Sequence, residues 1–302
     1  MDEKKIGIFL FVAISKFGSR WMPTTVYIKL LFYCRFRYKL NLLSPKTFNE
    51  KLQWLKIYDK NPEYIDDVDK FAVREKVKNT IGEKYLIPLI DYYIHPEDID
   101  YNRLPEQFVL KCTHGTHCSI ICKDKSKLNI QETNNMLRKW LKHNYYYDAR
   151  EWPYREVKPR IICEEYIAND KEGENFIDYK FLCFNGNVKL VMVHQDINNV
   201  NRSHTLDIYT PYWEKTKIKW GIPNSPNILP KPECLEECLH ICRILSQKRP
   251  HVRVDLYIVK NKIYFGELTY YSAAGFKPFD NFADDRMLGE LINIEGINAC
   301  KK

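Results

Sequence analysis

The sequence predicts an α+β protein, and three observations support this class. Helix patterns fill roughly the first 80 residues, strand patterns dominate after about residue 90, and two strand pairs carry short polar turns typical of antiparallel hairpins. This order lacks the regular alternation of strand and helix that marks a doubly wound fold. With 302 residues and 45% hydrophobic content, the chain can build a sizeable core. We therefore expect mixed helices and antiparallel sheets.

The N-terminal residues 1–65 are predicted to be helical. The apolar run Ile6 to Ile14 is too short to span a bilayer, so we expect a helix that packs against the protein or rests on a surface. The next stretch, "YIKLLFYCRFRYKL" from Tyr27 to Leu40, mixes aromatic and basic residues. Such a pattern suits either a helix lying on an anionic membrane or a helix with one solvated face.

Two further helices are expected before the strands begin. "SPKTFNEKLQWLKIYD" offers Ser44 or Thr47 as N-cap, followed by apolar residues at helical spacing. "DDVDKFAVREKVKNTIG" predicts a helix from about Asp67 to Lys78 that is closed by Gly82, and an extended run ending at Ile90 follows it.

The rest of the chain reads mainly as strands. "QFVLKCTHG" and "SIICKD" are two strands separated by a glycine-containing loop, a short helix covers Met136 to Leu141, and "PRIICEEYI" is a third strand. "DYKFLCFNGNVKLVMV" is a hairpin, because Asn185-Gly186 is a strong signal for a two-residue turn.

Charge and cysteine content narrow the class of protein. The net charge is +8, with lysine and arginine distributed among 39 acidic residues. This favours an anionic substrate or a membrane surface, and no nucleic-acid-binding motif is present. The ten cysteines lack the dense spacing of a disulfide-rich domain, so we expect reduced thiols. A zinc site is a weaker alternative, because the possible ligands match no standard zinc spacing: Cys112, His114, His117, Cys118 and Cys122.

A second cysteine group should be structural. Cys234, Cys238 and Cys242 recur every four residues and so lie on one side of a helix. Free cysteine often serves as a small apolar core residue, so a buried thiol stripe is expected here.

The segment "RVDLYIVKNKIYFGELTY", residues 253–270, places charged residues inside an apolar hairpin. If Lys260-Asn261-Lys262 forms a three-residue loop, Val259 lies opposite Ile263. One face of the hairpin then carries Arg253, Asp255, Glu267 and Thr269. A two-residue loop would place Asp255 and Glu267 on opposite faces, because a one-residue slip reverses every side chain.

Opposed carboxylates on this face need a cation. At about 5 Å they repel by roughly 3 kcal/mol at an effective dielectric constant of about 20. Oxygen ligands suit Mg²⁺, and the neighbouring arginine suggests that the metal arrives with phosphate. A solvated strand face with acids paired to nearby lysines is the alternative.

Seven segments, in order, resemble the ATP-grasp enzymes and, more narrowly, the TupA-like branch linked to teichuronopeptide and other surface-polysaccharide biosynthesis. They are "TFNEKLQWLK", "DKFAVREKV", "FVLKCTHG", "EEYI", "DYKFLCFNG", "RVDLY" and "FGELTY", and the resemblance runs from about Leu43 to Leu291. It implies two α+β subdomains that clamp a nucleotide. We expect a helical region at residues 1–65 and an ATP-grasp domain at 66–302, with a smaller clamping subdomain at about 106–165 and a metal and acceptor subdomain at about 166–302.

The resemblance also implies roles for individual residues. Lys70 and Lys111 match the lysines that face the nucleotide phosphates, and His114-Gly115-Thr116 matches the flexible loop over the triphosphate. Asp178 matches the acid that binds ribose, and Arg202 is expected to touch phosphate. The linker that bonds the adenine edge is matched by Glu164, Glu165, Tyr166 and Ile167. From the residues alone, the lysines could equally be surface residues and "EEYI" an ordinary strand end.

Asp255 and Glu267 match the family's magnesium carboxylates, and Arg253, with Lys111, is the expected catalytic residue. Where many ATP-grasp enzymes have an asparagine ligand, this chain has Thr269, so a hydroxyl or a water molecule would complete the metal site. The loop "YSAAGF" that follows resembles the segment that receives the acceptor substrate.

The resemblance implies a ligase that uses ATP and Mg²⁺ to join a carboxylate to an amine through an acylphosphate. The expected partners are a small-molecule or lipid-linked sugar carboxylate of a capsular or wall polysaccharide precursor, and an amine. The expected location is the cytoplasm, with peripheral contact at the inner membrane face through the N-terminal region. Two alternatives stay open: a glycosyltransferase-like protein that binds a nucleotide sugar, and a non-catalytic scaffold.

Overall fold

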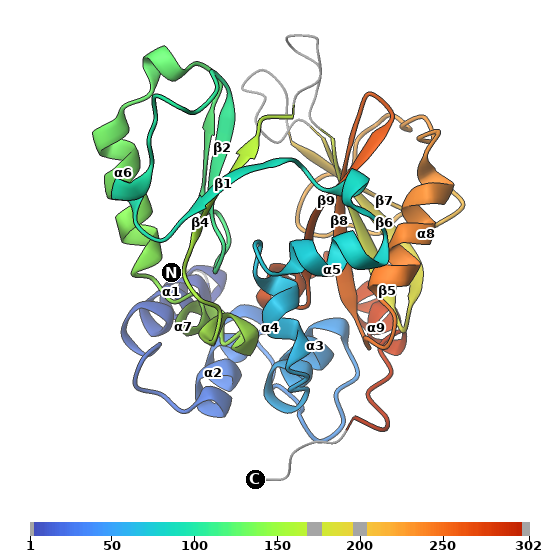
Figure 1. Cartoon of the computed structure of the whole chain (residues 1–302). Coiled ribbons are helices and arrows are strands. Elements are labelled where there is room, and N and C mark those ends of the chain that lie inside the picture. The colour runs from blue at the N-terminus through green and yellow to red at the C-terminus, as the bar shows by residue number, and fades with distance from the viewer. Residues whose placement is uncertain (1–2, 168–176, 196–203, 298–302) are drawn as a thin grey trace.

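The computed structural model describes residues 3–167, 177–195 and 204–297, and it confirms the α+β class. Two antiparallel sheets stand side by side, with the N-terminal helices below them in Figure 1. The smaller sheet has the order β1-β4-β2-β3: β1 Leu89–Tyr93, β2 Phe108–Cys112, β3 Ser119–Cys122 and β4 Ile161–Glu165. The larger has the order β7-β6-β5-β8-β9: β5 Asp178–Phe184, β6 Asn187–Gln195, β7 Thr205–Tyr209, β8 Val252–Val259 and β9 Lys262–Thr269.

The helices surround these sheets. They are α1 Glu3–Phe17, α2 Thr24–Phe36, α3 Phe48–Tyr58, α4 Glu63–Val68, α5 Val73–Thr80, α6 Ile130–Leu141, α7 Tyr146–Ala149, α8 Leu235–Leu245 and α9 Phe282–Glu290. Helix α6 packs on the smaller sheet in a core of its own, whereas the larger sheet shares its core with α2, α3 and α8. Two separate cores leave the space between the sheets free for a cavity.

The single helix predicted from Asp67 to Lys78 is wrong, because the chain breaks between α4 and α5. Asp69 has extended backbone angles, and its side chain accepts a 2.9 Å hydrogen bond from the backbone N–H of Phe71. Such local bonds compete with the helical pattern. The break lets the backbone N–H of Lys70 bond the carbonyl of Thr113, which ties this segment to the smaller sheet.

Helix α2 packs on the core and keeps one solvated face, as one of the two interpretations of Tyr27 to Leu40 expected. Its inner face is fully buried against the main core: Tyr27, Ile28, Leu31 and Phe32. Helix α1 lies on α2 and contacts the body of the protein edge-on through Phe11 and Phe276, whose ring centroids are 5.6 Å apart. Among the described residues, no helix is long and apolar enough to cross a membrane.

Helix α3 carries several polar side chains on its buried face. Thr47 is its N-cap and forms a capping box with Glu50, as one of the two predicted caps. Its buried side chains include Asn49, Glu50, Gln53 and Lys56. The backbone and side-chain amides of Asn49 both donate to Asp285 of α9, each at 3.0 Å. Buried polar groups need such partners, so α3 joins several distant loops through hydrogen bonds.

The cysteine prediction for α8 is confirmed. Cys234, Cys238 and Cys242 are buried along one side of the helix, and none forms a disulfide. Burial raises the pKa of Cys242 well above its usual value, so this thiol serves as apolar packing.

The β8–β9 hairpin has a two-residue turn, so the predicted three-residue loop is wrong. Lys260 and Asn261 both have positive φ (52° and 60°), as a type I′ turn requires. Val259 pairs with Lys262, and Ile263 pairs with Ile258 instead of Val259. The β5–β6 turn at Asn185-Gly186 is where the sequence predicts it.

A β-bulge nevertheless restores the predicted face. Leu256 pairs with Phe265, which leaves Gly266 as an extra residue before Asp255 pairs with Glu267. A Cβ atom on Gly266 would lie 3.0 Å from the carbonyl oxygen of Asp255, a tighter contact than most Cβ atoms make, so this close approach favours glycine. The pairings of Asp255 with Glu267 and of Arg253 with Thr269 are therefore confirmed, although the turn that was expected to produce them is absent.

Candidate functional site

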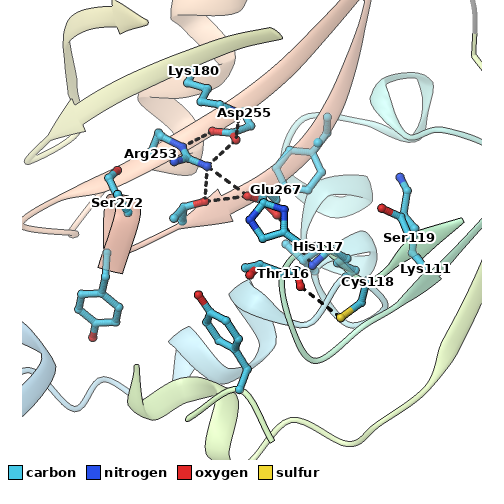
Figure 2. Close-up of a pocket in the computed structure, with 18 of the residues that line it drawn as sticks. Lys111, Thr116, His117, Cys118, Ser119, Lys180, Arg253, Asp255, Glu267 and Ser272 are labelled. Carbon is cyan, nitrogen blue, oxygen red and sulfur yellow. Dashed lines mark hydrogen bonds and ion pairs between the residues drawn. The ribbon is translucent and has the colours of Figure 1, made fainter. Parts of the chain in front are cut away.

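A cavity of about 470 Å³ opens between the two sheets. The smaller sheet contributes residues of β2, β3 and β4, and the larger sheet contributes residues of β5, β6, β8 and β9. Figure 2 shows Arg253 and Asp255 on one side of this cavity and Lys111 and Ser119 on the other. The predicted hairpin face forms the wall on the side of the larger sheet.

Arg253 is the centre of that wall. Its Nε and Nη2 donate to the two carboxylate oxygens of Asp255 at 2.6 and 2.7 Å. Nη2 also donates to Oε1 of Glu267 at 3.2 Å and to Oγ1 of Thr269 at 3.0 Å (Figure 2). The cation that the opposed carboxylates require is therefore supplied by the protein itself.

Lys180 completes the charge balance around Asp255. Its Nζ lies 2.9 Å from Oδ2 of Asp255 and also pairs with Asp178. Burial by itself would raise the pKa of Asp255, but Arg253 and Lys180 outweigh it and hold that pKa below its usual range. Burial would likewise lower the pKa of Arg253, yet the Asp255 carboxylate raises it. Both groups are therefore charged at neutral pH.

Lys70 connects the two walls of the cavity. Its Nζ donates to the carbonyl of Gly115 at 2.6 Å and lies 3.8 Å from Oε2 of Glu267. The glycine loop of the smaller sheet is thus linked by one lysine to the carboxylate pair of the larger sheet.

A second cluster of charged side chains lies at the smaller sheet, where two basic residues bond one glutamate. Glu164 of β4 is buried and accepts from Lys111 at 2.6 Å and from Arg74 at 2.7 Å. Arg74 also donates to the carbonyl of Ile87 at 2.7 Å. Arg74 was not among the predicted site residues. Its position four residues after Lys70 in "DKFAVRE" is the signal in the sequence that could have indicated it.

The cavity brings together eight of the predicted residues. They are Lys70, Lys111, Thr116, Glu164, Arg253, Asp255, Glu267 and Thr269. Six others lie outside its lining: His114, Gly115, Glu165, Tyr166, Ile167 and Asp178. Arg202 falls outside the residues that the structure describes.

His114 is buried beside α6, where its Nε2 lies 3.1 Å from the carbonyl of Trp140. Burial lowers the pKa of His114, so its ring is neutral. The cavity is instead lined by the residues that follow in the loop, His117, Cys118 and Ser119 (Figure 2).

The cavity lining contains a left-handed turn that no residue type in the sequence predicts, because two alanines form it. Ala273 and Ala274 have φ of 48° and 53° in the 3₁₀ turn Ser272–Gly275, and Gly275 has φ of 62°. Left-handed angles cost an ordinary residue about 1–2 kcal/mol, so the turn must be held by its surroundings.

Two side chains of α3 hold this turn. Gln53 donates to the carbonyl of Gly275 at 2.7 Å, and Lys56 donates to that of Ala274 at 2.6 Å. Lys56 also donates to the carbonyl of Ala149 at 2.8 Å, two residues before Glu151, which lines the cavity. Burial lowers the pKa of Lys56 to about 7 and raises that of Glu151 to about 7. Helix α3 thus positions two parts of the cavity lining.

Two antiparallel sheets that enclose a cavity, with lysines on one wall and a carboxylate pair on the other, place the chain in the ATP-grasp fold class. The chain belongs to the TupA-like ATP-grasp family, whose model matches residues 50–293. A comparison with curated proteins found no match.

Several solved structures are similar in fold. The D-alanine–D-alanine ligase of Bacillus anthracis, complexed with ATP, is 14% identical over 68% of this chain and 55% of its own, with a TM-score of 0.38. The ligase of the same name from Helicobacter pylori is 14% identical over 81% and 69% of the two chains, with a TM-score of 0.42. The N5-carboxyaminoimidazole synthase of Aspergillus clavatus, in complex with ADP, is 10% identical over 78% and 54%, with a TM-score of 0.40. The chain therefore spans about half the length of the Bacillus anthracis ligase.

Proposed function

We propose that the protein is an ATP-dependent ligase that joins a carboxylate to an amine through an acylphosphate. The observation that carries this proposal is the hydrogen-bonded face of Arg253, Asp255, Glu267 and Thr269, which shares one cavity with Lys70 and Lys111. Cations on both walls suit a triphosphate, and oxygen ligands between them suit its metal ion. Membership of the ATP-grasp family supports the same reaction class.

The residues present fit Mg²⁺ that arrives with a nucleotide. Among the positions that the structure describes, no three histidine, cysteine, aspartate or glutamate side chains gather into a metal site of their own. Mg²⁺ in phosphoryl-transfer sites commonly uses one or two protein carboxylates, together with phosphate and water. Asp255 and Glu267 would supply these carboxylates by sharing their oxygens with Arg253, which donates to both, and the hydroxyl of Thr269 is 3.0 Å from Glu267. Bound Mg²⁺ would offset charge on the transferred phosphoryl group.

Each residue then has a distinct task. Arg253 would stabilise negative charge on the phosphoryl group that moves from ATP to the substrate carboxylate, and Lys111 would neutralise nucleotide phosphates from the other wall. The amine would then attack the acyl carbon, form the C–N bond and release phosphate. Lys111 is bonded to Glu164, so a triphosphate would have to share or displace that ion pair. The remaining predicted nucleotide contacts, including the "EEYI" linker, belong to this proposal.

We further propose that the substrate is a carboxylate-bearing sugar of a capsular or wall polysaccharide precursor, free or lipid-linked. The support is the similarity to a family named for TupA and the cationic lining, which suits an anionic substrate. The predicted division at residue 66, with a clamping part at 106–165, stays part of the proposal, although the smaller sheet also includes β1 at Leu89–Tyr93.

The ligase proposal is tested by measuring ADP release from ATP and Mg²⁺ with pairs of acceptors drawn from amino acids and uronic-acid sugars. Mass spectrometry should find a product whose mass equals that of both substrates less one water. Robust ADP release with phosphorylated but never amide-linked products would contradict the ligase assignment and favour a kinase.

ATP with Mg²⁺ is expected to raise the melting temperature. A ligand that binds only the folded state at about 100 times its Kd raises the free energy of unfolding by about 2.7 kcal/mol. Differential scanning fluorimetry with ATP, ADP and UDP-sugars, each with and without Mg²⁺, checks this expectation. Protection by a UDP-sugar in the absence of any effect of ATP would favour the nucleotide-sugar alternative.

A further inference from the structure

The net positive charge of the protein comes from its N-terminal segment, although basic residues occur along the whole chain. Residues 4–49 contain nine of the 47 basic residues and none of the 39 acidic ones. The rest of the chain, with 38 basic and 39 acidic residues, is close to neutral. This cationic segment contains α2 and all of α1 except its first residue, Glu3.

Exposed apolar side chains gather in the same segment. Phe9 is 66% exposed on α1, and Trp21, between the helices, is 88% exposed. The other large apolar side chains exposed here are Ile8, Leu10, Val12, Val26, Leu30, Tyr33 and Leu43. Contiguous exposed apolar residues generally mark a surface that contacts another molecule or a membrane.

The exposed residues follow the helical period. On α1, Ile8, Phe9, Val12 and Lys16 are spaced i, i+1, i+4 and i+8, so they share one side of the helix. On α2, Val26, Leu30 and Tyr33 form a second stripe at i, i+4 and i+7, opposite the buried face. Lys29 and Arg37 flank that second stripe. Both helices of the pair therefore present apolar stripes bordered by basic residues.

We propose that the α1–α2 helix pair docks on the surface of an anionic phospholipid bilayer. Apolar side chains of an interfacial helix enter the boundary between head groups and acyl chains, while lysine and arginine meet the anionic head groups. Tryptophan is favoured at this boundary because its ring is amphipathic, which suits Trp21.

Charge and apolar content together favour a bilayer over other occupants. A symmetric contact with a second copy would bring the same cationic surface against itself, and like charges would repel. A nucleic acid would match the charge but would leave Phe9 and Val12 in water. The bilayer satisfies both the basic and the apolar side chains.

Docking would place the cavity near the membrane, because α1 and α2 both contact Phe276 beside the cavity lining. Phe11 of α1 packs on Phe276, and Arg35 of α2 donates to the carbonyl of Phe276 at 2.9 Å. Phe276 directly follows the left-handed turn that lines the cavity. The docking proposal does not depend on which reaction takes place there.

The test is co-sedimentation of the full chain with vesicles of phosphatidylcholine alone and of phosphatidylcholine mixed with phosphatidylglycerol. Two variants probe the two interactions: F9Q/W21Q for insertion, and K16Q/R20Q/K29Q for charge. A matched control, Y212Q/I228Q, removes two equally exposed apolar side chains, 83% and 73% exposed, far along the chain from α1 and α2. Melting temperatures establish that every variant is folded.

The unmodified protein should sediment with mixed vesicles in low salt and not with phosphatidylcholine alone. F9Q/W21Q and K16Q/R20Q/K29Q should each bind about 10-fold or more weakly, because each removes several interactions with the bilayer, and the control should bind normally. The proposal is overturned if mixed vesicles do not retain the protein, if the control loses as much binding as these two variants, or if light scattering shows a dimer that F9Q/W21Q dissociates.

Discussion

Glu267→Gln should reduce ATP turnover at least about 10²-fold while the protein stays folded. Glutamine keeps one oxygen to accept from Arg253 and Thr269, but it removes the charge that Mg²⁺ needs. The loss of well-placed charge stabilisation in a phosphoryl-transfer site typically has an effect of this size. ADP release at saturating ATP and Mg²⁺ measures it.

Stability separates this effect from unfolding. Glu267 is partly exposed and lies 3.8 Å from Lys70, so losing its charge should change the free energy of unfolding by about 1 kcal/mol or less. The matched control is Glu236→Gln. It removes the charge of an exposed glutamate of α8 that lies 3.2 Å from Lys231. It should keep full turnover. Normal turnover in Glu267→Gln would mean that Asp255 and Glu267 are ordinary paired charges.

Lys56→Met should lower kcat/KM for the acceptor about 10-fold or more, mainly by raising its KM. The variant removes the ammonium that bonds the carbonyls of Ala149 and Ala274, so the left-handed turn loses one of its two supports. Small displacements of substrate-positioning groups can cost up to about 10²-fold in rate. An unsatisfied buried carbonyl should also destabilise the protein by about 1–3 kcal/mol.

Lys51→Met is the matched control for the general cost of losing a lysine from α3. Lys51 lies on the same helix and also donates to a carbonyl, that of Ile292 at 2.8 Å, but it does not line the cavity. It should lose stability without a change in KM. If both variants lose activity only in proportion to their melting temperatures, α3 has no positioning role. Partial recovery of KM in Lys56→Arg would strengthen the case for positioning.

The hairpin shows how much of the site the sequence could reveal. Alternation of side chains placed Arg253, Asp255, Glu267 and Thr269 on one face, and this is what the structure has. The reason was different, because a two-residue turn and a bulge at Gly266 compensate each other. A glycine within a strand is a known signal for a bulge, so Gly266 could have been used to predict the register.

Other features depend on contacts between distant segments, which periodicity cannot reveal. The break between α4 and α5 depends on Asp69, which also binds Arg160 at 3.0 Å, and nothing local indicates that partner. The placement of α2 depends on distant loops, because Tyr27 donates to the carbonyl of Asp148, 121 residues later, and Arg35 donates to that of Phe276, 241 residues later. Likewise, Lys56 has the pattern of an ordinary helix lysine until its distant carbonyl partners are known.

The long reach of α3 also constrains how the chain folds during synthesis. Asn49 is separated by 236 residues from Asp285, which accepts its two hydrogen bonds. At about 5–20 residues per second, a ribosome needs roughly 10–50 s to translate that interval. During this time Asn49 and Gln53 lack their native partners, which lie beyond residue 270, so the larger sheet and its N-terminal helices can assemble only near the end of translation. The smaller sheet and α6, which are complete by residue 165, can fold while the rest of the chain is still being made.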